Sequence, residues 1–375
     1  MPYDSCENRR ARNGRRRKLG SVARIHHGKF IDGGSIDQKG EEGKIGMKIV
    51  VLKGGASSER EVSLNSGMNI ANALKENGHD VLCLDTVLPI EQIKSPMKPT
   101  PKMIRNGDRN LVTLLTAPEV QSAKFVFNAL HGGTGENGAV QAILETMGLK
   151  FNGSGVEGCA IAMDKIVSKV LFEKHGIPTP EWLSFQNDGK RPNAEIIEAI
   201  LTKFQPPLVV KPAHEGSTVG LTIVRDVQSL GNALKIARKY NGSILVEKFI
   251  EGRELTVAVL GDKALPIVEI CPKHGIYDYE CKYTSGMSEY RTPAEIEPML
   301  TRLIQDWTVV AFKALSCSGY GRMDLRLSLD HKPYFLEMNS LPGMTSLSLV
   351  PKAAKADGIS FNELLEKIIK LGLSR

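Results

Sequence analysis

The chain has 375 residues, of which 41% are apolar and 24% are charged, a composition typical of a soluble globular protein with two or three domains. No apolar run approaches the roughly 18 residues that span a bilayer, and the polar N-terminus lacks the apolar core of a secretory signal. The six cysteines form no CxxC pair and no zinc spacing, which indicates reduced thiols in a cytoplasmic protein.

The net charge of +7 is concentrated near the N-terminus. Residues 1–46 hold 11 Lys/Arg and 6 Asp/Glu, so they carry +5, and the other residues carry +2. This distribution argues against nucleic acid as a partner of the main body. The first 46 residues have little apolar content and no periodicity, and we expect them to be disordered. They are either a start-site extension or a targeting or nucleic-acid-binding arm.

An α/β pattern begins after this leader. A buried strand at 47–55 runs into glycines and is followed by a loop, a helix and a second strand at 81–86. Residues 89–110, rich in Pro, Lys and Asn, are expected to form a loop. The strand at 124–130 ends in a glycine-rich turn, HGGTGENG, at the edge where ligands gather in open α/β sheets. The pattern predicts a Rossmann-like N-terminal domain over residues 47–163.

Two further domains are expected. The pattern over residues 164–252 predicts a small α+β unit of helix, strand, Gly/Ser loop, strand, helix and strand. Residues 253–375 begin with a two-strand meander, followed by the Tyr-rich segment PKHGIYDYECKYTSGMSEYRTP. That segment is long and polar, and we expect it to be irregular and to act as a mobile lid. A helix at 294–315 and a final amphipathic helix complete the pattern.

Polar residues alternate along two strands of the segment 318–345. The first strand carries Arg322 and Asp324, and the second carries Glu337 and Asn339. Residues two apart on a strand point to the same face of a sheet. Two carboxylates, an amide oxygen and a guanidinium therefore form an oxygen-only site for a hard cation such as Mg²⁺, with substrate phosphates completing its shell. A solvated hairpin with ordinary surface charges is the alternative.

The segment KPAHEGSTVG is suited to phosphate. Lys211 on a strand can reach a phosphate as a point charge, and Gly216, Ser217 and Thr218 offer backbone N–H groups in a nest. No Walker motif exists anywhere in the chain. A plain Gly-rich hairpin is the alternative interpretation of this loop.

The end of a later strand is suited to a nucleobase. Backbone groups of Glu247, Lys248 and Ile250 could contact the edge of adenine while Phe249 packs on its face. Glu254 could bind the ribose hydroxyls. Taken alone, this segment is better explained as an ordinary edge strand that bears surface charges.

Together these motifs resemble the ATP-grasp superfamily and, within it, the D-alanine–D-alanine ligase family. The resemblance covers the chain from about Met47 to its C-terminus, and HGGTGENG matches the ligase signature HGxxGE[DN]G. The predicted fold class is accordingly α/β, with a Rossmann-like N-terminal domain followed by the two-domain ATP-grasp fold. Residues 164–252 would be the central ATP-grasp domain and residues 253–375 the C-terminal one.

The resemblance also implies roles for individual residues. Glu59, which could otherwise be a simple helix-capping residue, would bind the substrate ammonium, beside Ser217 and Tyr283 in a hydrogen-bonded trio that closes the lid. His131 would lie near the first substrate. The other implied residues are catalytic Arg322 and Ser348, ATP-binding Lys165, Lys211, Glu247, Lys248, Phe249, Ile250, Glu254 and Lys282, substrate-binding Gly343 and Leu349, and metal-binding Asp324, Glu337 and Asn339.

The function implied is ATP-dependent joining of two D-alanines through an acyl phosphate, for peptidoglycan precursor synthesis. ATP and two Mg²⁺ or Mn²⁺ ions would be the cofactors of a cytoplasmic homodimer that binds neither nucleic acid nor membrane. Two alternatives are an ATP-grasp ligase with another amino or hydroxy acid acceptor and a non-catalytic nucleotide-binding scaffold.

Arg326 departs from the family pattern, which usually has an apolar residue at this position. Strand alternation puts Arg326 on the same face as Asp324. Its side chain is therefore expected either to pass the site and reach solvent or to contact phosphate.

Overall fold

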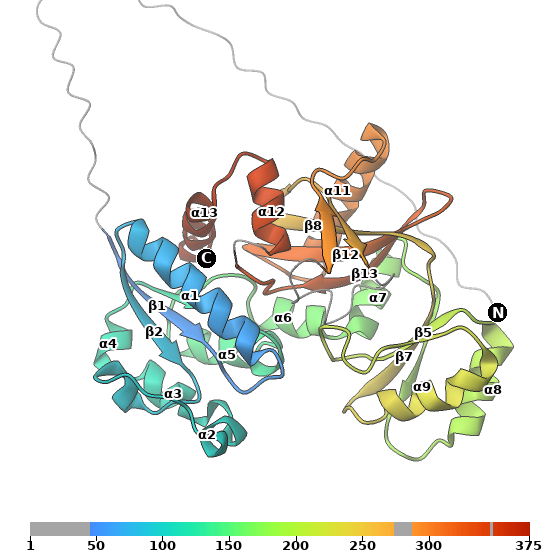
Figure 1. Cartoon of the computed structure of the whole chain (residues 1–375), viewed down its shortest axis with the longest axis horizontal. Coiled ribbons are helices and arrows are strands. Elements are labelled where there is room, and N and C mark those ends of the chain that lie inside the picture. The colour runs from blue at the N-terminus through green and yellow to red at the C-terminus, as the bar shows by residue number, and fades with distance from the viewer. Residues whose placement is uncertain (1–45, 274–286, 346–347) are drawn as a thin grey trace, which may run out of the picture. The chain divides into compact units, whose positions relative to one another are not determined.

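The computed structural model describes residues 46–273, 287–345 and 348–375, all of which belong to one structural unit. The predicted leader, except for Gly46, and the lid residues Lys282 and Tyr283 lie outside these ranges. Within the described ranges, no helix is both long and apolar enough to cross a membrane. Three β-sheets organise this part of the chain (Figure 1).

The first sheet is parallel and has the strand order β2-β1-β3. The strands β1 and β3 are nearly continuous apolar runs that are mostly buried, as a parallel sheet requires, whereas the edge strand β2 is only partly buried. The parallel pairing confirms the Rossmann-like prediction for this region. The elements are β1 (Lys48–Lys53), α1 (Arg60–Glu76), β2 (Asp80–Asp85), α3 (Leu111–Leu115), α4 (Pro118–Gln121), β3 (Phe125–Asn128), η3 (Gly133–Gly135), α5 (Ala139–Thr146) and α6 (Val156–Met163).

The prediction of a loop over residues 89–110 is partly wrong. This stretch contains the short helical elements η1 (Ile90–Ile93), α2 (Pro101–Asn106) and η2 (Asp108–Asn110). Local signals explain α2, because Thr100 Oγ1 accepts from the N–H of Met103 at 3.3 Å and Pro101 occupies the first helical position.

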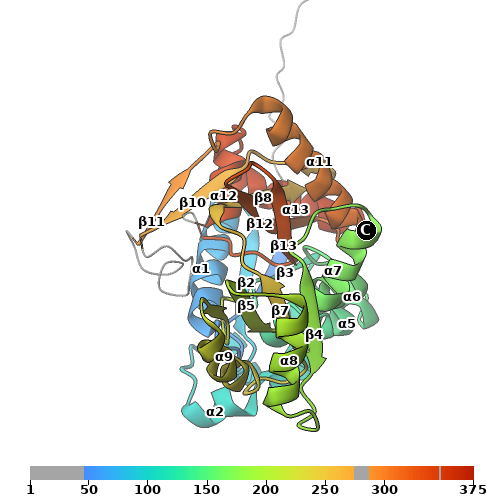
Figure 2. The same cartoon turned by 90° about the vertical axis from the view of Figure 1, so that its right-hand side faces the viewer.

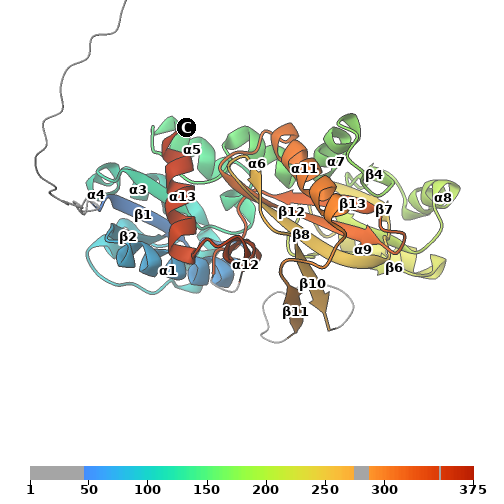
Figure 3. The same cartoon turned by 90° about the horizontal axis from the view of Figure 1, so that it is seen from above.

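The last helix, α13 (Phe361–Leu373), packs against α1 of the first sheet (Figures 1 and 3). Asn77 Nδ2 donates to Glu366 Oε1 at 2.6 Å, and His79 Nε2 lies 2.9 Å from the same oxygen. The apolar face of α13 joins the core beneath β1 and β3. The chain therefore returns to its first sheet after completing the third.

The second sheet is antiparallel, with the order β4-β7-β5-β6. The helices α8 and α9 cover one face of it (Figure 2), and their apolar residues join its core. Lys211 lies on β5, and Glu247 and Lys248 lie on β7, so the sheet carries three of the predicted nucleotide-binding charges. Its elements are β4 (Trp182–Gln186), α8 (Asn193–Lys203), β5 (Leu208–Pro212), β6 (Thr222–Val224), η4 (Val227–Ser229), α9 (Leu230–Ala237) and β7 (Ser243–Lys248).

The third sheet is also antiparallel and runs β11-β10-β8-β12-β13, with β9 paired to β8. Apolar residues of α7 and α11 pack on one face, and those of α12 pack with β8 and β10. The elements are α7 (Lys165–Lys174), β8 (Gly252–Leu260), β9 (Lys263–Ala264), β10 (Val268–Pro272), β11 (Ser288–Arg291), α11 (Pro298–Ala314), β12 (Tyr320–Ser328), β13 (Pro333–Asn339) and α12 (Leu349–Ala356).

Two features of this sheet were not predicted. Residues 288–291 form β11, although the whole Tyr-rich segment was expected to be irregular, because they complete the edge ladder of β10. The rest of that segment, 274–286, lies outside the described residues. The sequence also offered no indication of the helix α12, since this helix is only eight residues long and begins in a Ser- and Leu-rich run.

Candidate active site

The strands β12 and β13 bring four polar residues together on one face of the third sheet. Their register pairs Arg322 with Asn339 and Asp324 with Glu337, and a bulge follows Asp324. The intervening residues of β12, including Met323, are buried on the other face. Alternation and pairing thus converge two carboxylates, an amide and a guanidinium, the arrangement predicted for a hard cation.

Asp324 is held in place by its neighbours. Thr256 Oγ1 donates to Asp324 Oδ1 at 2.7 Å, and Arg322 donates to Oδ1 from Nε at 2.9 Å and to Oδ2 from Nη2 at 2.7 Å. A carboxylate has about four lone-pair sites, so these three hydrogen bonds leave capacity on Oδ2 for a cation.

The other two oxygen donors of this face are also oriented. Glu337 Oε2 lies 3.1 Å from Lys165 Nζ, and Asn339 Oδ1 accepts from the N–H of Leu341 at 3.0 Å. Over the described ranges, no group of three or more His, Cys, Asp or Glu side chains could hold a metal ion. A cation here would depend on two carboxylates, the amide and phosphate oxygens, which suits Mg²⁺ or Mn²⁺ and not zinc.

A buried carboxylate between two lysines lies beside this face. Glu247 Oε1 is 2.5 Å from Lys211 Nζ, and Glu247 Oε2 is 2.7 Å from Lys169 Nζ. Burial raises the pKa of the Glu247 carboxyl, but the two lysines outweigh burial and hold that pKa below its usual value. Burial lowers the pKa of Lys169 despite Glu247, whereas Glu247 and Glu337 outweigh burial and raise the pKa of Lys211.

Lys169 was missed in the sequence. Its side chain is fully buried, and Nζ also donates to Thr179 Oγ1 at 2.6 Å. Its spacing offered a signal, because Lys165 and Lys169 are four residues apart and so lie on one face of α7. Lys165 contacts Glu337, and Lys169 contacts Glu247, so α7 supplies one lysine to each of two predicted ligand-binding carboxylates.

The Gly/Ser loop between β5 and β6 adopts an uncommon backbone conformation. Ser217 and Thr218 have φ values of 48° and 66°, which few non-glycine residues adopt, and such strain is frequent at ligand-binding loops. Ser217 Oγ donates to Glu59 Oε1, at the N-terminus of α1. The loop is also tied to α7, because Lys165 Nζ donates to Glu215 O at 2.6 Å.

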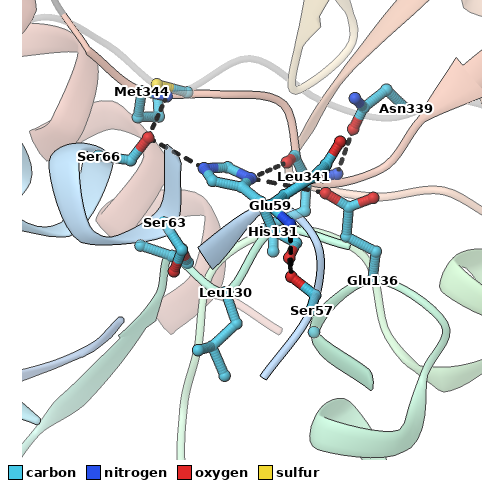
Figure 4. A network of polar contacts seen from close by, with 12 residues as sticks. Ser57, Glu59, Ser63, Ser66, Leu130, His131, Glu136, Asn339, Leu341 and Met344 are labelled. Atoms are coloured by element: carbon cyan, nitrogen blue, oxygen red, sulfur yellow. Dashed lines mark hydrogen bonds and ion pairs between the residues drawn. The ribbon is translucent and has the colours of Figure 1, made fainter. Parts of the chain in front are cut away.

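His131 lies in a polar network that joins the first and third sheets (Figure 4). Its Nδ1 donates to Leu341 O at 3.1 Å, and its Nε2 lies 3.0 Å from Ser66 Oγ. Ser66 Oγ in turn accepts from the N–H of Met344 at 3.4 Å. Both ring nitrogens of His131 thus hold the 341–344 segment, which positions the loop before α12.

That loop ends at Ser348, the N-cap of α12. Ser348 Oγ accepts from the N–H of Thr345 at 3.0 Å and lies 2.9 Å from Thr345 Oγ1. A Cβ at Gly343 would be 3.2 Å from Ser348 Oγ, so the glycine permits close packing here. Leu349 begins the helix, whose N-terminus favours negative charge.

Arg326 corrects one of the two expectations for its position, and contact with phosphate stays a prediction. The side chain of Arg326 does not pass to solvent, because it is only 14% exposed and its Nη1 pairs with Glu254 Oε2 at 3.0 Å. Its other nitrogens donate to Ile250 O and Gly252 O at 3.1 and 2.8 Å. The physical reason is the strand register, which places Arg326 directly opposite Glu254 on β8.

Two cavities collect the predicted residues. The larger, about 630 Å³, is lined by Glu59, His131, Lys165, Ser217, Arg322, Glu337, Asn339, Gly343, Ser348 and Leu349, among others. The smaller, about 140 Å³, is lined by Lys165, Lys211, Glu247, Lys248, Phe249, Ile250, Glu254, Asp324 and Glu337, among others. Lys165, Gly216 and Glu337 line both, so the cavities meet at these three residues.

Comparisons with known proteins identify the family of the chain. The family models described as D-ala D-ala ligase N-terminus and D-ala D-ala ligase C-terminus match residues 48–154 and 171–370. The chain belongs to the D-alanine–D-alanine ligase family. This membership confirms the resemblance found in the sequence.

Curated family members match along nearly their whole length. The chain is 41% identical over 332 residues to the D-alanine–D-alanine ligase of Carboxydothermus hydrogenoformans, covering 87% of this chain and 98% of the relative. It is also 41% identical over 325 residues to the Aquifex aeolicus ligase, covering 86% and 100%.

Solved ligases of the family share the fold. The Bacillus anthracis ligase complexed with ATP has a TM-score of 0.68 at 30% identity, covering 88% of this chain and 97% of that chain. The Coxiella burnetii ligase has a TM-score of 0.71 at 28% identity, covering 88% and 94%. These matches confirm the predicted fold class, a Rossmann-like region followed by the ATP-grasp fold.

Proposed function

We propose that this chain joins two D-alanines at the expense of ATP, for the synthesis of peptidoglycan precursors. The carboxylate of the first D-alanine attacks the γ-phosphorus of ATP, which forms an acyl phosphate and releases ADP. The amine of the second D-alanine, having lost a proton, then attacks the acyl carbon and displaces phosphate. The observation that carries the proposal is the meeting of two cavities at Lys165, Gly216 and Glu337.

ATP binds in the smaller cavity in this proposal. Lys211 and Lys165 contribute positive charge toward its phosphates, and the strained backbone of Ser217 and Thr218 offers N–H groups. Because Glu247 pairs with both Lys169 and Lys211, it offsets one of their two positive charges, so the three side chains can be buried together without a large net charge.

The metal-binding face lies where the two cavities meet. Asp324, Glu337 and Asn339 would hold Mg²⁺ or Mn²⁺, two ions being the expected number. When bound, these ions would neutralise phosphate charge in the transfer. Arg322 orients Asp324 and faces the larger cavity, where it can stabilise charge on the transferred phosphoryl group.

The two D-alanines bind in the larger cavity. Glu59, which accepts from Ser217, is placed to bind the ammonium of the first, with His131 fixing the loop beneath. Gly343, Ser348 and Leu349 are placed for the acyl oxygen and the acceptor carboxylate, at the N-terminus of α12. Tyr283 and Lys282, outside the described residues, remain the predicted lid contacts of substrate and ATP, and a lid would protect the acyl phosphate from water.

Three broader assignments complete the proposal. The domains are residues 47–163, 164–252 and 253–375, in keeping with the three sheets, and the basic leader precedes them. The enzyme acts in the cytoplasm, in keeping with the free thiols of Cys83, Cys159, Cys271 and Cys317. It forms a homodimer, which rests on the family resemblance and is tested by sedimentation equilibrium.

The test is a phosphate-release screen over D- and L-amino acids and hydroxy acids, with the product masses measured. We expect ATP-dependent release with D-alanine and a product mass equal to two D-alanines minus one water. Release with another acid, without a D-alanine dipeptide, would overturn the proposed substrate. ATP binding without release for any acid would favour a non-catalytic scaffold.

A further inference from the structure

Arg326 on β12 contacts both the segment that leads from β7 into β8 and the first residues of β8. Its Nε donates to Ile250 O at 3.1 Å, its Nη2 donates to Gly252 O at 2.8 Å, and its Nη1 pairs with Glu254 Oε2 at 3.0 Å. The guanidinium carbon also lies 5.6 Å from the centroid of the Phe249 ring. One side chain therefore holds two carbonyls, a carboxylate and an aromatic ring in fixed relation.

The environment of the Arg326–Glu254 pair strengthens these contacts. The side chains of Arg326 and Glu254 are 14% and 20% exposed, so water screens the pair less than at an open surface. Both residues line the smaller cavity, together with Lys211 and Glu247. A guanidinium presents its donors in a rigid planar fork, so the two hydrogen bonds and the ion pair fix the position of the carboxylate.

We infer that Arg326 is a positioning residue for the sugar of the nucleotide, and that through Glu254 it sets the preference for ribose over 2′-deoxyribose. This inference rests on the proposed binding of ATP in the smaller cavity. A carboxylate has about four lone-pair sites, so Glu254 can bind Arg326 and still accept from sugar hydroxyls. A sugar that lacks the 2′-hydroxyl loses a donor to this fixed acceptor.

The base-contacting backbone is positioned by the same side chain. Ile250 and Gly252 accept from Arg326 through their carbonyls, which fixes the orientation of the Ile250–Glu251 and Gly252–Arg253 peptide groups. Binding of the sugar and base is the same before and during phosphoryl transfer. Loss of Arg326 should therefore raise KM for ATP more than it lowers kcat.

The experiment compares kcat/KM for ATP with that for 2′-deoxyATP in the wild-type enzyme and in Arg326→Met. Methionine is unbranched and of similar reach but cannot hold a carboxylate. We expect KM for ATP to rise about tenfold, which corresponds to about 1.4 kcal/mol. The ratio of the two kcat/KM values should fall toward one. Arg326→Lys, which keeps the charge but not the fork, should give an intermediate ratio.

Arg225→Met is the matched control. The Arg225 guanidinium carbon lies 5.8 Å from the centroid of the same Phe249 ring, but Arg225 is exposed and follows β6 of the second sheet. Like Arg326→Met, this variant removes one positive charge from beside the Phe249 ring, but it leaves the Arg326–Glu254 pair in place. We expect its ATP to 2′-deoxyATP ratio to equal that of the wild-type enzyme.

Glu254→Gln separates action through Glu254 from general damage. If Arg326 acts through this carboxylate, the double variant Arg326→Met/Glu254→Gln loses no more sugar discrimination than Glu254→Gln alone. An unchanged ratio in Arg326→Met, or additive losses in the double variant, would overturn the inference. If Arg326→Met does not fold, the ratio of Arg326→Lys decides in the same way. Absence of D-alanine-dependent ADP release in the wild-type enzyme would instead reject the proposed function.

Discussion

The two cavities of this ligase are built in different ways. The smaller is lined by charges that the fold buries and pairs: the side chains of Lys211 and Glu247 are only 8% and 3% exposed. The larger is lined by Arg322, Glu337 and Asn339 of β12 and β13, together with residues of loops and helices from other parts of the chain. Glu337, at the junction of the cavities, is 30% exposed. The proposed nucleotide site is therefore built around buried ion pairs, whereas the proposed D-alanine site has a more exposed carboxylate at its edge.

This difference separates two kinds of charged residue. A buried ion pair that loses one partner leaves a charge that the interior cannot solvate, so its variants should mainly reduce stability. A half-exposed carboxylate can be rehydrated when its partner is lost, so its variants should mainly reduce activity. Substitutions of each kind test whether the two kinds of residue differ in this way, and the largest effect is expected at the proposed metal-binding face.

Glu337→Gln should lower kcat at least about 100-fold, because removal of a proposed metal ligand costs several kcal/mol of transition-state stabilisation. The melting temperature should hardly change, since the side chain is partly exposed. Steady-state ADP release and thermal unfolding measure the two effects. Asp330→Asn, an exposed carboxylate in the turn of the same hairpin, is the control and should leave both unchanged. A Glu337 variant with more than a tenth of wild-type kcat would refute the metal assignment.

Lys169→Met should lower the free energy of unfolding by about 3 kcal/mol, because it removes one of the two buried cations that compensate Glu247. The urea midpoint at pH 7 measures this loss. Lys174→Met, an exposed lysine in the last turn of the same helix, should change it little. A loss below about 1 kcal/mol would mean that the Lys169–Glu247 pair stabilises the fold no more than an ordinary surface ion pair does.

The sequence predicted those parts of the site that depend on alternation and motif spacing. Arg322, Asp324, Glu337 and Asn339 share one face because a strand has a period of two, and the pairing of β12 with β13 follows from their short turn. The parallel first sheet was likewise visible in the apolar runs of β1 and β3.

What could not be predicted depends on contacts between distant segments. The pairing of Arg326 with Glu254 requires the register of β12 on β8, and the two residues are 72 positions apart in the chain. In the sequence, Lys169 is indistinguishable from the other lysines of an amphipathic helix. Its role becomes visible only in the structure, where it pairs with Glu247 of β7. Similarly, β11 has no apolar pattern and forms because β10 offers it an edge.

Acid should reduce the difference in stability between the wild-type enzyme and Lys169→Met. The pKa of Glu247 lies below its usual value in the folded enzyme, so its ion pairs stabilise the fold fully above about pH 4.5 and are lost as the pH falls through the folded pKa. Without Lys169 the folded pKa of Glu247 should rise, so less stability is lost on acidification. Urea unfolding of both proteins between pH 7 and pH 3 measures the change, by about 1.4 kcal/mol for each unit of pKa difference. A constant difference across this range would contradict the assignment.

Ser217→Ala should have the smallest effect, and that effect should be confined to the binding of D-alanine. The Ser217 hydroxyl donates to Glu59, in the larger cavity, and a hydrogen bond of this kind contributes roughly 0.5–1.5 kcal/mol. KM for D-alanine should therefore rise about two- to tenfold while KM for ATP stays the same. Thr218→Val is the matched comparison, because Thr218 is the next residue of the same strained loop but lines the smaller cavity. Its effect should fall on KM for ATP. If Ser217→Ala raises KM for ATP instead, Ser217 and Thr218 do not serve different ligands. The proposal that D-alanine and ATP bind in separate cavities that meet at Gly216 would then be wrong.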